Sequence, residues 1–372
     1  MNFETVAIQS THFQDANVSA VVPPIYLSTT FEREPDSSIP HGHIYTRTSN
    51  PNRSALENAY AILEGGEVGM AFASGQAAVT TLFQCLAPGD HVILPDDVYY
   101  GTPALLQDVL SLWGLSYSRV DMSNLEAVRG AFLPNTKLVW IETPSNPLLK
   151  ITNISAIAVL ARTKGAISAC DNTWATPVLQ RPLDLGCDVV MHSATKYFGG
   201  HSDLLSGALI FKQSGPLTEK ARRIQALGGA VPSPFDCWLV LRGIKTLSLR
   251  VRQQSANAAQ IATFLSNHPK LDAVHYPFLE SHLGHDVAKQ QMASGGAMLS
   301  IQVKGGAEDA LAVKSKVKIF IRATSLGGVE SLIEHRATAE GAYATSPPNL
   351  LRISVGLEHP DDLIADLAQA LG

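Results

Sequence analysis

The chain contains 372 residues, of which 45% are hydrophobic and 16% are charged, and its formal net charge at pH 7 is −5. This length allows two or three domains and a substantial hydrophobic core. The acidic balance and the lack of any Lys/Arg run argue against nucleic acid or an anionic membrane as the main partner.

The sequence shows no signal for export or for membrane insertion. Its first residues, MNFETVAIQSTHF, do not combine a basic segment with a nonpolar one, and no nonpolar run reaches the roughly 18 residues needed to cross a bilayer. The cysteines have neither CxxC nor CxxH spacing, so we expect core thiols rather than disulfides or a zinc site. We therefore expect a cytoplasmic protein without a bound metal.

Residues 1–44 predict an arm rather than a domain. They contain Pro23-Pro24 and Pro40 and show little periodicity after the first turns. His41 and His43 have no third potential ligand nearby, so we expect exposed loop histidines rather than a metal site.

Residues 45–245 alternate between short nonpolar runs and helical patterns, which predicts an α/β domain. Strands are expected at 68–72, 91–95, 137–141, 166–170 and 187–191, and helices at 53–63 and 75–86. The turn Ser74-Gly75-Gln76 would place the N–H groups of Gly75 and Gln76 at a helix N-terminus, where an anion can bind. An ordinary strand-to-helix turn has the same pattern.

Residues 246–372 predict a second, smaller α+β domain. A helical pattern with a period near 3.6 runs from 236 to about 268 and forms the hinge into this domain. Strand-like runs follow at 297–304, 317–323 and 351–355, and a helix at 360–371.

Two predicted strands of the first domain end in residues that suggest a site. One ends at Asp171, and the next leads through Ser193 and Thr195 to Lys196. Ligands of open α/β sheets bind at this edge. A lysine that forms an imine, with a carboxylate that keeps a pyridine nitrogen protonated, is what pyridoxal 5′-phosphate chemistry requires. Taken alone, the same residues also fit a solvated lysine and a helix-capping aspartate.

Three longer segments are specific enough to indicate a family: DNTWATP at 171–177, HSATKYFGGHSD at 192–203 and SLGGVESL at 325–332. They resemble the Cys/Met-metabolism family of pyridoxal-phosphate enzymes, which includes cystathionine γ-synthase, γ-lyase and β-lyase and methionine γ-lyase. The match runs in order over nearly the whole chain. It implies the α/β fold type I of aspartate aminotransferase, with a mostly parallel central sheet, helices on both faces and a smaller α+β C-terminal domain.

The resemblance also implies roles for individual residues. Lys196 would bind pyridoxal phosphate and move protons, Asp171 would hold the ring nitrogen, and Tyr99 would stack on the ring. Further cofactor contacts are expected from Gly75, Gln76, Ser193, Thr195 and Asn146. Substrate would be bound by Arg352, whose fork of donors suits an α-carboxylate, with Ser325 and Asn146 beside it. Without the family, Arg352 fits a structural ion pair equally well.

The family's YxR segment corresponds to Tyr45 and Arg47, which would hold the cofactor phosphate of an adjacent subunit. The resemblance thus implies a homotetramer built from dimers that share active sites, with residues 1–44 contacting the neighbouring subunit. The predicted partner is otherwise a small amino-acid substrate.

The expected function is a transsulfuration enzyme that makes or breaks the carbon–sulfur bond of cystathionine-type amino acids, of the γ-synthase or γ-lyase type. Cystathionine β-lyase is an alternative, because DNTW at 171–174 looks like β-lyases. A pyridoxal-phosphate aminotransferase and a non-catalytic binding protein are weaker alternatives. The chain departs from the family pattern at Gln76, Tyr100, Ala104, Thr324 and Arg336, and Arg336 receives no role from the sequence.

Overall fold

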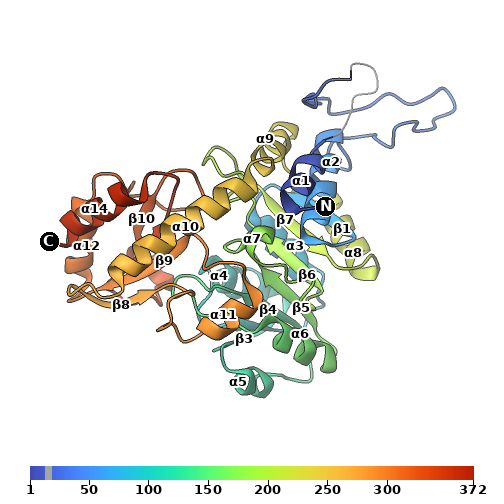
Figure 1. The fold of residues 1–372 in the computed structure, drawn as a ribbon. Helices are drawn as coiled ribbons and strands as arrows, with labels where there is room; N and C mark the ends of the chain where they lie inside the picture. The colour runs from blue at the N-terminus through green and yellow to red at the C-terminus, as the bar shows by residue number, and fades with distance from the viewer. Residues whose placement is uncertain (13–18) are drawn as a thin grey trace.

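The computed structural model describes residues 1–12 and 19–372, which contain two β-sheets. A seven-stranded sheet lies in the N-terminal part and a four-stranded sheet in the C-terminal part (Figure 1). The helix α10 (Leu247–Leu265) runs from the first part into the second.

The larger sheet has the strand order β1-β7-β6-β5-β4-β2-β3. Its strands are β1 (Val68–Phe72), β2 (His91–Pro95), β3 (Ser116–Val120), β4 (Thr136–Glu142), β5 (Ile167–Asp171), β6 (Val189–His192) and β7 (Gly207–Phe211). Pairing is parallel from β3 to β6, and β7 runs antiparallel to both of its neighbours. The predicted mostly parallel sheet is therefore confirmed.

Helices cover both faces of this sheet, because alternate residues of its strands enter separate cores. Val190 of β6 packs in a core with residues of α2 (Pro51–Glu64) and α9 (Pro234–Ile244), whereas Val189 packs with residues of α3 (Gly75–Gln84) and α4 (Gly101–Asp108). The remaining helices of this part are α5 (Leu125–Gly130), α6 (Ile154–Thr163), α7 (Thr176–Leu179) and α8 (Pro216–Gly228).

The smaller sheet is antiparallel, with the order β10-β11-β9-β8. Its strands are β8 (Leu271–His275), β9 (Met298–Val303), β10 (Leu332–His335) and β11 (Leu350–Ser354), and its helices are α11 (His285–Gln291), α12 (Ala307–Lys316), α13 (Arg336–Glu340) and α14 (Pro360–Leu371). The predicted α+β architecture is confirmed. Neither β8 nor β10 was predicted from the sequence.

The predicted helical pattern at 236–268 is confirmed with one break, and the predicted strand at 317–323 is wrong. The pattern at 236–268 forms two helices, because Thr246 leaves the helical conformation between α9 and α10 while the nonpolar periodicity continues. Residues 317–323 form no strand and make a single bridge at Ile321. The carboxylate of Asp366 accepts the backbone N–H groups of Lys318, Ile319 and Phe320, so these groups cannot join a ladder.

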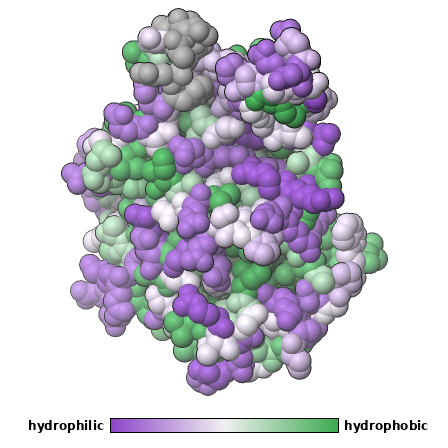
Figure 2. Space-filling view, turned by 90° about the vertical axis from the view of Figure 1, so that its right-hand side faces the viewer, coloured by the Kyte–Doolittle hydropathy of each residue, from purple (hydrophilic) through white to green (hydrophobic). Residues whose placement is uncertain are grey.

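The described part of residues 1–44 contains the helix α1 (Phe3–Gln9) and an extended segment that projects from the larger domain (Figure 1). Asn52 of α2 bonds the backbone of Pro24 and Tyr26, and the Trp238 indole donates to Pro23. On the face shown in Figure 2, hydrophobic and hydrophilic residues are interspersed. No helix in the described ranges is long and nonpolar enough to span a membrane.

Candidate active site

One cavity, with a volume of about 340 Å³, lies at the carboxyl ends of β4, β5 and β6 and is bounded on another side by residues of the smaller domain. Ten of the predicted site residues line it: Gly75, Gln76, Tyr99, Asn146, Asp171, Ser193, Thr195, Lys196, Ser325 and Arg352. Residues from both domains therefore meet at the edge of the sheet where ligands of α/β proteins bind.

Lys196 follows β6 in a tight turn and reaches across to the smaller domain. Its Nζ lies 2.7 Å from Oγ of Ser325. Burial, together with the charge of the nearby Arg352 guanidinium, lowers the pKa of Lys196 to about 8. An amine with a pKa close to neutrality is neutral often enough to act as a nucleophile and as a base.

Glycines allow the turn after Lys196 to pack closely. A side chain on Gly200, whose φ is +73°, would overlap the guanidinium of Arg250, which donates to the carbonyl of Tyr197. A side chain on Gly327 would contact the backbone nitrogen of Tyr197 at 2.9 Å. The turn that carries Lys196 is therefore packed between the long helix α10 and the SLGG segment.

Asp171 ends β5 and faces the cavity. Its Oδ1 accepts the backbone N–H of Thr173 at 2.9 Å, a local turn that orients the carboxylate. Burial raises the pKa of Asp171, and the bond from Thr173 and the charge of His192 act against this rise. A buried carboxylate of this kind gains stability from a cationic partner in the cavity.

The N-terminus of α3 forms another wall. Ser74 caps this helix by accepting the N–H of Ala77 at 3.1 Å, and the N–H groups of Gly75 and Gln76 lie in the first turn, where an α-helix has no internal acceptors. A side chain on Gly75 would come within 3.0 Å of Ser193, so glycine keeps this corner open. The hydroxyl of Thr195 donates a hydrogen bond to the backbone carbonyl of Ser206.

Tyr99 is held between its neighbours at the end of β2. Its backbone N–H donates to both carboxylate oxygens of Glu142 at 3.1 Å. Its ring centroid lies 4.9 Å from that of Tyr100. A side chain on Gly101 would come within 2.5 Å of the Tyr99 ring, so Gly101 lets the ring take this position.

Arg352 of β11 is buried and makes three contacts. Its guanidinium donates to Glu334 at 2.6 Å, to the carbonyl of Ser325 at 3.1 Å and to Oδ1 of Asn146 at 3.2 Å. Ser325 has φ of +100°, a strained conformation for a residue with a side chain. In this conformation its carbonyl meets Arg352 while its hydroxyl meets Lys196.

Comparison with known proteins agrees with this arrangement. The sequence model of the Cys/Met metabolism PLP-dependent enzymes matches residues 4–372. The chain belongs to this family. Cystathionine γ-synthase of Mycobacterium tuberculosis is 46% identical over 99% of this chain and 96% of its own, and cystathionine β-lyase of Coxiella burnetii is 42% identical over 100% and 98%. The solved structure of cystathionine γ-lyase from Lactobacillus plantarum, with L-serine bound, has a TM-score of 0.94 and 40% identity and covers 100% of this chain and 98% of its own.

Family membership confirms the predicted PLP-dependent transsulfuration enzyme, its fold and its cofactor, pyridoxal phosphate. The cavity of this Cys/Met metabolism enzyme fits that cofactor. It contains an amine of lowered pKa, a carboxylate oriented by a turn, and a helix N-terminus whose first residue is a glycine with no room for a side chain.

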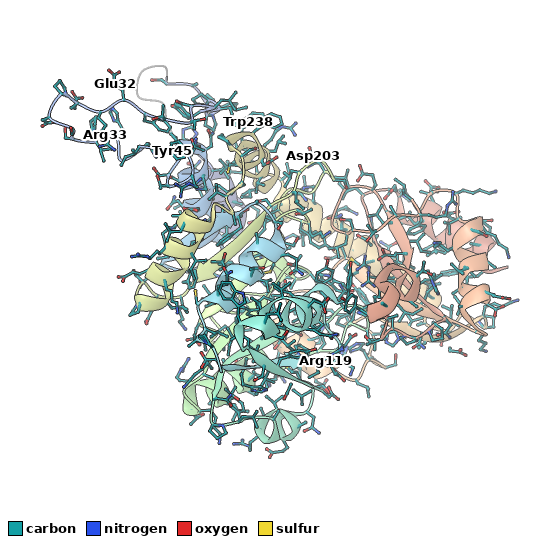
Figure 3. All side chains as sticks on the ribbon, turned by 180° about the vertical axis from the view of Figure 1, so that it is seen from behind. Glu32, Arg33, Tyr45, Arg119, Asp203 and Trp238 are labelled. Atoms are coloured by element: carbon teal, nitrogen blue, oxygen red, sulfur yellow. The ribbon has the colours of Figure 1, made fainter. Side chains whose placement is uncertain are left out.

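Tyr45 and Arg47 are the two predicted site residues that the structure does not bring to the cavity. Tyr45 lies at the base of the projecting arm, far from the smaller domain (Figure 3). The Arg47 guanidinium lies 5.8 Å from the Tyr45 ring centroid and bonds the carbonyl of Ala226. Within one chain of this family member, the two residues are therefore separate from Lys196.

Sequence analysis missed three charged residues of the site. Glu142 pairs in register with Asp171, and burial together with the Asp171 charge raises its pKa well above the usual value. Glu334 lies opposite Arg352 in the β10–β11 ladder. Arg336 lines the cavity. Glu142 could have been found as a strand-end carboxylate beside Asp171, but Glu334 lies on a strand that was not predicted.

Proposed function

We propose that this enzyme acts at the γ-carbon of its amino-acid substrate and forms or cleaves the carbon–sulfur bond of cystathionine. The observation that carries the proposal is that Lys196, Asp171 and Arg352 line one cavity. One cavity thus offers a base (Lys196), a partner for the cofactor's ring nitrogen (Asp171) and a pair of donors for the substrate's α-carboxylate (Arg352). The higher identity to the γ-synthase than to the β-lyase favours chemistry at the γ-carbon.

Bound pyridoxal phosphate supplies an electron sink for the charge that develops at the substrate Cα. Asp171 would keep the proton on the ring nitrogen, Tyr99 would stack on the ring, and the N–H groups of Gly75 and Gln76 would bind the phosphate together with Ser193 and Thr195, which line the same cavity. Arg352 exchanges its bonds to Asn146 and Ser325 for the substrate α-carboxylate.

Lys196 moves the protons. It would take the proton from Cα and give it up to the bound cofactor, which returns Nζ to the neutral amine. For chemistry at the γ-carbon it would then take a second proton from Cβ, which it can deliver to the departing γ-substituent. Its hydrogen bond to Ser325 holds Nζ in the cavity, and its lowered pKa favours the neutral amine that accepts these protons.

Product analysis tests the assignment. With cystathionine, a γ-lyase releases cysteine, 2-oxobutyrate and ammonia, and a β-lyase releases homocysteine, pyruvate and ammonia. With O-succinylhomoserine and cysteine, a γ-synthase releases cystathionine and succinate. Release of homocysteine and pyruvate from cystathionine, transamination without ammonia, or no turnover of any of these substrates would contradict the proposal.

The active species in this proposal is a homotetramer of dimers that share active sites, in which the chain divides into an arm (1–44), a cofactor domain (45–245) and a C-terminal domain (246–372). Two observations support sharing. Tyr45 and Arg47 lie outside the cavity of their own chain, and the arm exposes the hydrophobic residues Val21, Val22 and Leu27. The four cysteines are unpaired, as is usual in the reducing cytoplasm, which is the proposed location.

Mixing two inactive variants tests sharing. Arg47→Ala and Lys196→Ala chains should each be inactive alone. After subunit exchange they should recover about a quarter of wild-type activity, because half of the dimers are hybrids and each hybrid has one intact site. Demonstrated exchange without recovery would show that each site is built by one chain.

A further inference from the structure

Three cationic side chains line the cavity among the described residues: Lys196, Arg352 and Arg336. The proposed function employs the first two. Arg336 begins α13, and its side chain is only 2% exposed. A buried arginine at a ligand cavity needs an explanation, because burial of a charge is costly unless the charge is paired or serves a ligand.

Arg336 belongs to a network of alternating charges. Oε2 of Glu334 accepts from Arg336 at 2.8 Å and from Arg352 at 2.6 Å. Burial acts to raise the pKa of Glu334, but the two arginines hold it below the usual value. The two guanidinium groups therefore share one carboxylate and lie close enough for a small dicarboxylate to reach both.

The second partner of Arg336 is already well satisfied. Oε1 of Glu340 accepts a hydrogen bond from the Arg336 guanidinium at 3.2 Å. The Glu340 carboxylate also accepts hydrogen bonds from the backbone N–H groups of Thr345 and Ser346 and from the Ser346 hydroxyl. The Nε of Arg336 is buried and has no acceptor among the described residues. Arg336 thus keeps a buried hydrogen-bond donor that no acceptor in the described part of the chain satisfies.

Arg336 also lies beside the aromatic wall of the cavity. Its guanidinium carbon is 6.0 Å from the ring centroid of Tyr100, which packs against Tyr99. Its positive charge reaches the reactive groups, because it lowers the pKa of Lys196 and opposes the rise in the pKa of Tyr99. Thr102, Thr324 and Ala339, which also line the cavity, are uncharged, whereas Glu142, which accepts the backbone N–H of Tyr99, is a carboxylate whose pKa Arg336 acts to lower.

We propose that Arg336 forms a second anion subsite, which binds a carboxylate at the far end of the substrate while Arg352 binds the α-carboxylate. The preferred substrates are then amino acids with an anionic distal group, such as O-succinylhomoserine or cystathionine, over neutral ones such as O-acetylhomoserine. This inference rests on the proposed function and narrows its substrate class.

The test compares two ligands that differ only at the distal end. L-2-aminoadipate and L-norleucine have six carbons each, and carry a carboxylate and a methyl group, respectively, at the sixth. Their dissociation constants are measured with the holoenzyme by calorimetry, which requires no turnover. We expect the wild type to bind aminoadipate more tightly, and Arg336→Gln to weaken aminoadipate by roughly ten- to hundredfold while norleucine changes little.

Two further variants serve as controls. Glu340→Gln disturbs the same ion-pair network but removes a negative charge, so it should preserve or raise the preference for aminoadipate. Arg336→Lys should keep part of the preference, since it keeps the charge. Thermal unfolding of each variant separates a loss of stability from a loss of recognition.

Several outcomes would overturn the inference. Equal weakening of both ligands in Arg336→Gln would place Arg336 at the α-carboxylate. No change for either ligand would make Arg336 a structural ion pair. A wild type that does not prefer aminoadipate would refute the subsite even if Arg336→Gln fails to fold.

Kinetics separate failure of this inference from failure of the proposed function. If the wild type cleaves or forms carbon–sulfur bonds but uses O-acetylhomoserine as well as O-succinylhomoserine, the subsite is refuted and the function stands. If it processes neither ester nor cystathionine, the function is refuted, and the ligand comparison still decides whether Arg336 binds a distal carboxylate.

Discussion

The two sides of the cavity are held in different ways. On the cofactor side, two of the groups are fixed by structure next to them in the chain: Asp171 by the turn to Thr173, and the start of α3 by the Ser74 cap. On the substrate side, Arg352, Glu334 and Arg336 fix one another through ion pairs. A local turn fixes its own group without help from elsewhere, whereas in a buried network of charges a change in one member affects its partners.

The strongest test of the cofactor side is Lys196→Ala. We expect loss of the yellow colour of the bound cofactor and of its covalent attachment, and a fall in turnover of at least roughly 10²–10⁴-fold, because proton transfer is removed as well. Absorption spectra and peptide mass spectrometry after borohydride reduction measure the attachment. Ser325→Ala is the control, since it removes only the hydrogen bond to Lys196 and should keep the link. A reducible link to another lysine in the Ala variant would contradict the assignment.

Asp171→Asn tests the same side with almost no change in shape. The amide oxygen can still accept the N–H of Thr173, so the cofactor should bind, but an amide cannot stabilise a protonated ring nitrogen. We expect a loss of several kcal/mol of transition-state stabilisation, about tenfold in kcat for each 1.36 kcal/mol. Steady-state kinetics and a cofactor titration together measure it. Turnover close to that of the wild type would exclude Asp171 from this role.

Arg352→Lys tests the substrate side. The positive charge remains, but a lysine cannot present two parallel donors to a carboxylate. We expect KM to rise by roughly ten- to hundredfold for every amino-acid substrate, whatever its distal group. This uniform loss contrasts with the selective loss expected for Arg336→Gln. An unchanged KM would show that the α-carboxylate binds elsewhere.

The smallest expected effect concerns the pKa of Lys196 on the cofactor side, which the arginines of the substrate side lower. Free lysine has its pKa at 10.5, and burial and Arg352 bring that of Lys196 to about 8. Because the neutral amine is the reactive form, attachment of pyridoxal phosphate to the apoprotein should accelerate as pH rises and level off above about 8.

Arg336→Gln should shift this profile to higher pH, because the charge removed is one that lowers the pKa of Lys196. Stopped-flow absorbance across pH 6–10 would record both profiles. Glu340→Gln, which removes a negative charge instead, should not shift the profile upward. A midpoint near 10.5 in the wild type would show that Lys196 is an ordinary solvated lysine.

Much of the cofactor side could be predicted from the sequence, because each of its residues belongs to a contiguous motif. Nonpolar runs located β4, β5 and β6 to within a few residues, and the residues after them had to lie at one edge of the sheet. The family segments then supplied roles for Asp171 and Lys196, and the structure places both at one cavity.

The substrate side depended on the tertiary structure. Glu334 and Arg352 are 18 positions apart and become neighbours only through the register of β10 and β11, and four-residue β10 has too few residues for its periodicity to be recognised. Arg336 appeared in the sequence as an unexplained departure from the family pattern. Its place beside Arg352 follows from strand pairing and helix packing, which no local pattern encodes, whereas hydrophobic periodicity and turn chemistry act between near neighbours and can be seen in the sequence alone.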